Sequence, residues 1–84
     1  MSHVFVTIPI TTLWPSRDEL NARDAVTDAL SAAGIGVCTG AGGGLGEMDF
    51  SYRVIDESAA RATIERVMRE LMPGLEFRVR VSDS

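Results

Sequence analysis

The sequence predicts a single α+β domain, spanning residues 1–84, in which strands and helices follow the order β-α-β-β-α-β. Two hydrophobic patterns predict it. In several short segments, apolar residues alternate with other residues, as in strands with one buried face. In two longer segments they recur at helical spacing, as in helices that bury one side. The predicted strands are residues 3–8, 35–39, 48–54 and 75–81, and the predicted helices are residues 17–33 and 57–71.

The ends of both helices carry their own signals. Ser16 and Glu19 form an S-x-x-E capping box, in which each side chain satisfies a backbone amide at the start of the first helix. Gly34 is a natural C-terminal stop for that helix. Asp56 is the expected N-cap of the second helix, and the Pro-Gly pair at residues 73–74 ends it.

The order of the elements predicts how they are arranged in space. A strand-helix-strand unit occurs twice, and right-handed crossovers place both helices on the same face of one antiparallel sheet. The expected strand order in that sheet is fourth, first, third, second. This arrangement is the split βαβ, or ferredoxin-like, plait.

In topology the chain resembles ACT-type regulatory domains, small signal-transduction plaits and compact bacterial immunity proteins that neutralise a partner toxin. The resemblance spans nearly the whole chain and depends on element order alone, so it transfers no functional residue. It implies either binding of a protein partner or sensing of a small ligand. Acylphosphatases share the plait, but their glycine-rich phosphate loop and its arginine are not found after residues 3–8.

Composition narrows the expected partners and location. The net charge is −4, and all eight cations are arginine, which disfavours nonspecific binding to nucleic acids and anionic membranes. One cysteine excludes an internal disulfide, and no apolar run approaches membrane-span length, so we expect a cytoplasmic protein. A domain this small often gains burial by self-association, which makes a homodimer possible.

The sheet face away from the helices is the first candidate binding surface. There the pattern places Phe5, Arg53, Arg78 and Arg80, and guanidinium groups suit carboxylates and phosphates. Acidic neighbours on the same face, Glu76 and Asp49 among them, can neutralise these arginines. A solvated face, or one covered by a second subunit, is the alternative. The base-stacking aromatics of RNA-binding plaits are missing from residues 48–54.

The glycine-rich segment at residues 40–46 is the second candidate. We expect a long flexible hairpin there, which either stays mobile or orders on an anion or a partner. It lacks the spacing of a dinucleotide-binding loop, and the chain has no lysine for a Walker loop. Its glycines are Gly40, Gly42, Gly43, Gly44 and Gly46.

No catalytic or metal constellation stands out, so we expect no enzyme and no cofactor. His3 and Cys38 are solitary, and Cys38 is interpreted as a small apolar filler. Trp14 is expected to pack against Leu20, with exposure as an interface anchor the alternative. The expected function is a small non-enzymatic protein-interaction module, of which an immunity or antagonist protein is one example; the alternative is an ACT-like sensor of a small ligand.

Overall fold

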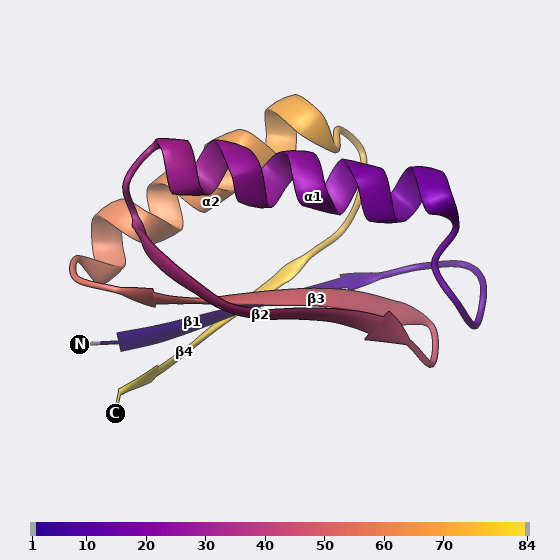
Figure 1. The fold of residues 1–84 in the computed structure, drawn as a ribbon, viewed down its shortest axis with the longest axis horizontal. Helices are drawn as coiled ribbons and strands as arrows, with labels where there is room; N and C mark the ends of the chain where they lie inside the picture. Colours follow the sequence, from indigo (N-terminus) through magenta and orange to yellow (C-terminus); the bar gives the residue numbers. More distant parts are fainter. Residues whose placement is uncertain (1, 84) are drawn as a thin grey trace.

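The computed structural model describes residues 2–83 and contains four strands and two helices in the predicted order (Figure 1). The elements are β1 (Ser2–Pro9), α1 (Arg17–Ala32), β2 (Gly36–Gly44), β3 (Glu47–Val54), α2 (Glu57–Leu71) and β4 (Arg78–Asp83). Within these residues, no helix is long and apolar enough to span a bilayer.

The sheet confirms the predicted topology. Its strand order is β2-β3-β1-β4, and every neighbouring pair is antiparallel. Both helices lie on one side of the sheet, and the chain is therefore a ferredoxin-like plait (Figure 1). The two ends of the chain lie at one end of the sheet, and the turn between β2 and β3 lies at the other.

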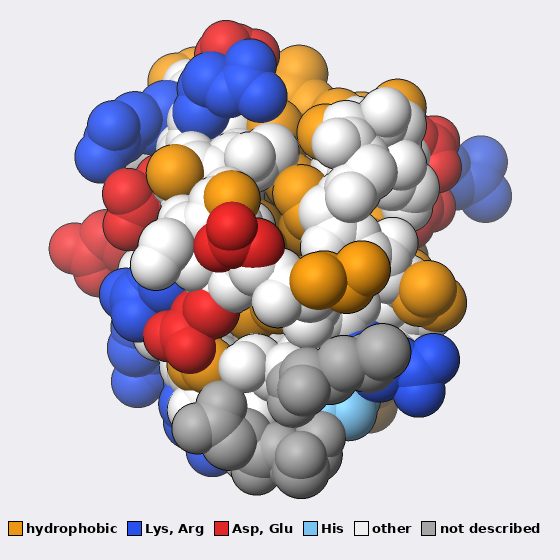
Figure 2. Space-filling model, turned by 90° about the vertical axis from the view of Figure 1, so that its left-hand side faces the viewer, with side chains coloured by type: hydrophobic (Ala, Val, Ile, Leu, Met, Phe, Trp, Pro, Cys, Tyr) orange, Lys and Arg blue, Asp and Glu red, His pale blue; other side chains and the backbone are white. Residues whose placement is uncertain are grey.

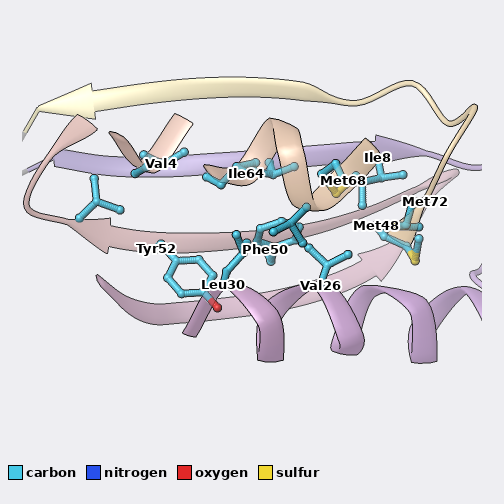
Figure 3. Packing of buried hydrophobic residues seen from close by; sticks show 14 residues of the cluster. Val4, Ile8, Val26, Leu30, Met48, Phe50, Tyr52, Ile64, Met68 and Met72 are labelled. Atoms are coloured by element: carbon cyan, nitrogen blue, oxygen red, sulfur yellow. The ribbon is translucent and has the colours of Figure 1, made fainter. Parts of the chain in front are cut away.

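The core lies between the helices and the two central strands (Figure 3). β1 and β3 bury alternate residues toward the helices, and α1 and α2 each contribute an apolar stripe. Each large side chain buried here stabilises the fold by about 1.5–3 kcal/mol relative to exposure. The largest fully buried side chains are Tyr52, Phe50, Ile8, Leu30, Met48, Ile64 and Met68.

The helix starts form as the sequence predicts. The Ser16 hydroxyl accepts from the Glu19 amide at 3.1 Å, and the Glu19 carboxylate accepts from the Ser16 amide at 2.8 Å. Asp56 accepts from the amide of Ala59 at 3.0 Å at the start of α2. These bonds satisfy amides that have no partner inside the helices.

The last strand begins three residues later than predicted. β4 starts at Arg78, which lies opposite Thr7, and Leu75 is 46% exposed instead of facing the core. Continuing the register would set Glu76 opposite Pro9, which has no amide hydrogen to donate. The expectation of an inward-facing Leu75 within a strand is therefore wrong.

The long flexible hairpin predicted at residues 40–46 is also wrong. Gly40, Gly42, Gly43 and Gly44 belong to β2 and lie opposite residues of β3, with a bulge between Cys38 and Gly40. Only residues 45–46 form the turn. The sequence interpretation ended the second strand too early because ordering glycines in a strand is entropically unfavourable. Pairing with the eight residues of β3 offsets this entropy cost.

Candidate functional site

Three exposed large apolar residues lie at the end of the sheet that holds the β2–β3 turn. Leu13, Trp14 and Leu45 gather there, with 59%, 64% and 83% of their surfaces exposed. We call these three residues the apolar tip. Exposed large side chains that occur singly need no explanation, but a contiguous group of them marks an interaction site.

Hydrogen bonds fix the loop that carries Leu13 and Trp14 against the turn. The Gly46 amide donates to the Leu13 carbonyl at 2.9 Å, and the Ile10 amide donates to the Gly46 carbonyl at 2.8 Å. The Thr12 hydroxyl donates to the Trp14 carbonyl at 2.7 Å. The apolar tip is therefore held in one arrangement without burial of its side chains.

Two glycines of β2 make room for this loop. A Cβ atom at Gly44 would lie 2.5 Å from the Trp14 ring, and one at Gly43 would lie 2.8 Å from the Pro15 ring. Trp14 lies over Gly44 and is 64% exposed. Part of the glycine-rich segment thus serves to bring an indole ring and a proline close to the strand.

Leu45 has a backbone conformation that leucine rarely adopts. Its φ is +54°, and Gly46 follows with φ +83°. A two-residue hairpin turn with both φ values positive favours Asn-Gly or Gly-Gly, and a residue with a Cβ atom is destabilised there by about 1–2 kcal/mol. An exposed leucine in this place contributes nothing to the core, so a binding role explains it better than stability does.

The outer edge of β2 adjoins the apolar tip. In residues 2–83 the strand pairs only with β3, and its nine residues include neither a charged residue nor a proline. The other edge strand, β4, has six residues and carries Arg78 and Arg80. Charges, prolines and shortness are the usual means by which edge strands avoid unwanted pairing, so β2 is the less protected edge.

Charged side chains are unevenly distributed at the other end of the molecule. Figure 2 shows the end of the molecule opposite the apolar tip, and most of its charged side chains gather on the left, the side of α2 and β4. Uncharged surface covers much of the upper right, on the side of α1 and β2.

One cation from α1 does reach β2. Arg23, only 13% exposed, donates from Nη1 to the Gly42 carbonyl at 2.8 Å and pairs through Nη2 with Asp24 at 3.3 Å. Its Nε is buried and has no partner among the described residues. The guanidinium thereby ties α1 to the middle of β2.

The predicted arginine surface is divided into separate contacts. The Arg80 guanidinium lies over the Phe5 ring, 4.9 Å from its centroid, as a cation–π pair. Arg78 pairs with Glu47 at 3.6 Å; the Arg78 side chain is largely exposed and that of Glu47 about half exposed. Arg53 lies opposite His3, near the other end of β1. The sheet does not focus the three guanidinium groups on one point.

Of the hollows that open at the sheet, one lies beside β2 and another beside the start of β4. The first, of about 330 Å³, lies on the face away from the helices, where Gly40 and Gly42 carry no side chain. Its other lining residues include Phe5, Asp49, Ser51 and Arg80. The second, of about 590 Å³, lies where residues 75–77 leave the sheet and is lined mainly by apolar groups.

Tyr52 and Cys38 are cross-strand neighbours with different surroundings. The Tyr52 hydroxyl donates to the Thr27 carbonyl at 2.7 Å and shares a 2.9 Å hydrogen bond with Ser31, which joins β3 to α1. Burial raises the pKa of Tyr52. Cys38 is exposed, so its interpretation as a small apolar filler is wrong, and its thiol lies 3.7 Å from the Gly40 carbonyl. Among residues 2–83 no group of His, Cys, Asp or Glu could hold a metal ion.

Comparison with protein-family models gives no match to this chain, and comparisons with curated proteins and solved structures give no significant match. The apolar tip and the edge of β2 are features that the sequence interpretation missed. The available signal was the Leu-Gly pair at residues 45–46, directly before a strongly alternating strand, which is the position of a two-residue turn.

Proposed function

We propose that this chain is a small non-enzymatic protein-binding module of the immunity or antagonist type, and that the apolar tip is its main contact. The observation that carries the proposal is Leu45, which is 83% exposed in a backbone conformation that destabilises it. A leucine that harms stability and protrudes into solvent is explained by contact with a partner.

The chemistry of the apolar tip suits a protein partner. Tryptophan is enriched among the residues that dominate binding energy, and burial of a leucine-sized side chain contributes about 1.5–3 kcal/mol. A leucine on a two-residue turn, beside a tryptophan, has the shape to enter an apolar pocket. By inserting a side chain into such a pocket, a small antagonist blocks the binding or active site of a larger protein.

The test measures the affinity of the chain for its partner in the native host, recovered by affinity purification and then produced separately. Leu45→Asn is the informative variant, because asparagine tolerates the positive φ that leucine does not. We expect it to weaken binding at least tenfold, about 1.4 kcal/mol. We also expect it to raise the free energy of unfolding by about 1 kcal/mol.

Ile55→Asn is the matched control. Ile55 is 86% exposed and follows β3, whereas Leu45 and Gly46 precede it, so the two positions lie at opposite ends of the same strand. The control should leave affinity within twofold of the unsubstituted chain. Equal losses for both variants, or no loss with Leu45→Asn, would reject the apolar tip as the contact.

A further inference from the structure

The outer edge of β2 offers backbone groups for pairing. In an antiparallel ladder the residues of an edge strand direct alternate amide and carbonyl groups away from the sheet. β2 presents such groups along nine residues without a charge or a proline to hinder a neighbour. Arg23 occupies one lone pair of the Gly42 carbonyl, and a carbonyl oxygen has two.

The face of the sheet away from the helices provides an acidic group beside this edge. Asp49 lies opposite Gly42, and its carboxylate is 3.4 Å from where a Cβ atom at Gly42 would stand. Within residues 2–83 Asp49 is exposed and makes no ion pair. The hollow of about 330 Å³ opens at this place, so the path from the edge to Asp49 is clear.

The absence of a side chain at Gly42 determines whether a side chain of an added strand can reach Asp49. A strand added beside β2 would lie two strand spacings, roughly 10 Å, from β3. A lysine or arginine on that strand could extend across Gly42 toward the Asp49 carboxylate. Any larger residue at position 42 would stand in the way.

The face toward the helices brings an ion pair and one further carboxylate of α1 toward this edge. Asp24 is exposed beside Arg23, which reaches Gly42. Asp28 is near enough to the Tyr52 hydroxyl to influence it electrostatically, and Tyr52 lies opposite Cys38 of β2. Two arginines without an ion pair among the described residues lie near this strand. Arg53 lies opposite Val37, away from the Gly40–Gly44 part of the edge, and Arg80 lines the same hollow as Asp49 with its guanidinium over the Phe5 ring.

We infer that the outer edge of β2 binds an extended basic segment of a partner protein as a fifth strand, with a lysine or arginine lying across Gly42 toward Asp49. The inference rests on the proposed protein-binding function and specifies the partner's chemistry. A second copy of the chain is the less favoured occupant. Pairing of β2 with β2 would bring two α1 helices and their Asp24 and Asp28 side chains together, on chains that each carry a net charge of −4.

The test uses two synthetic nine-residue peptides, one of alternating threonine and lysine and the other of alternating threonine and glutamate. Affinity is measured by fluorescence anisotropy, and hydrogen exchange followed by NMR locates the bound peptide on the protein. We expect the lysine peptide to bind at least tenfold more tightly than the glutamate peptide. The protected amides should belong to residues 36–44.

Two pairs of variants sharpen the test. Ala41→Lys places a positive charge on the edge and should lower the affinity for the lysine peptide at least fivefold. Ala62→Lys, on the exposed surface of α2, should leave that affinity unchanged. Asp49→Asn should lower the affinity for the lysine peptide about threefold. Glu70→Gln, an equal charge change on α2, should have less effect on that affinity.

Three results would overturn the inference. The first is that the two peptides bind with equal affinity or that neither binds. The second is that peptide-induced amide protection is confined to the surface around Phe5 and Arg80. The third is that amide protection of residues 36–44 grows with protein concentration in the absence of peptide. The last result would identify a second copy as the occupant. Because neither peptide was chosen to fill the apolar tip, Leu45→Asn should leave peptide binding unchanged, so the two proposals can fail separately.

Discussion

At the scale of single residues, Tyr52 shows how a polar group can be buried in the core with its hydrogen bonds satisfied. It is the only tyrosine in the chain and is fully buried. Its hydroxyl has partners in Thr27 and Ser31, both on α1. A buried hydroxyl with its hydrogen bonds satisfied fixes the distance and rotation of the helix relative to β3.

Tyr52 makes stability depend on pH in the alkaline range. Burial raises its pKa above the ordinary value of 10.0; the hydrogen bond to Ser31 lowers it, and the charges of Cys38 and Asp28 raise it further. Above about pH 10 the unfolded chain therefore loses the phenol proton before the folded chain does, and the free energy of unfolding falls as pH rises. Below that pH the contribution is fully present.

Absorbance of tyrosinate during an alkaline titration checks this directly, because no other tyrosine contributes. The folded protein should titrate at higher pH than the denatured protein. Tyr52→Phe should lower stability at neutral pH by about 1 kcal/mol and reduce the further decline above about pH 10. Coincident titration curves for folded and denatured protein would contradict the assignment.

At the scale of elements, β2 combines glycines with different roles. Gly36 has φ +155°, and a Cβ atom there would collide with the backbone carbonyl of Arg53. Gly43 and Gly44 admit the rings of Pro15 and Trp14. Gly40 has ordinary strand geometry, and its nearest neighbour would be the Ser51 hydroxyl at 3.7 Å.

Alanine substitutions should separate these roles. Gly36→Ala should lower the free energy of unfolding by about 2 kcal/mol or more, because both the backbone angle and the Arg53 carbonyl oppose a side chain. Gly40→Ala should raise it by about 0.5 kcal/mol, because alanine restricts the unfolded chain. Denaturant unfolding measures both, and similar effects at the two positions would contradict the assigned roles.

The elements also show how far the sequence predicts this fold. The alternation in residues 48–54 and the helix caps at Ser16 and Asp56 are local signals, and the structure confirms them. The extent of β2 could not be predicted locally, since glycine disfavours strands and the compensating partner, β3, follows the turn. The late start of β4 likewise depends on Pro9, far away in sequence.

The candidate site was less predictable than the fold. Alternation placed Phe5 and the arginines on the sheet face away from the helices. The Arg78–Glu47 ion pair and the stacking of Arg80 over Phe5 depend on strand register, which alternation does not give. The apolar tip combines residues from two loops that meet only in the folded chain. Leu45 is unusual only because of its φ, and no hydrophobic pattern reports a backbone angle.

At the scale of the whole molecule, stability is concentrated in the centre of the sheet. β1 and β3 each pair on both sides and bury one face beneath the helices, whereas β2 and β4 each pair on one side. Within the described residues β4 is the shortest strand and lines up only with β1. Opening of β4 therefore exposes less of the core than opening of β1.

Hydrogen exchange should follow this order. Amides of β1 and β3 that donate within the sheet should exchange most slowly, close to the rate set by global unfolding, and those of β4 should exchange at least tenfold faster. NMR-detected exchange on the isolated protein measures the difference. Protection of β4 equal to that of β1 would indicate that the sheet opens as one unit.

The position of Ser2 beside Asp83 has a practical consequence for handling the molecule. Both lie at the end of the sheet remote from the β2–β3 turn (Figure 1). A dye, an affinity handle or a linkage to a sensor chip attached at either terminus would therefore project away from Leu45 and Trp14. Because Ser2 and Asp83 are neighbours, a short linker between these two positions would permit a circularly permuted form.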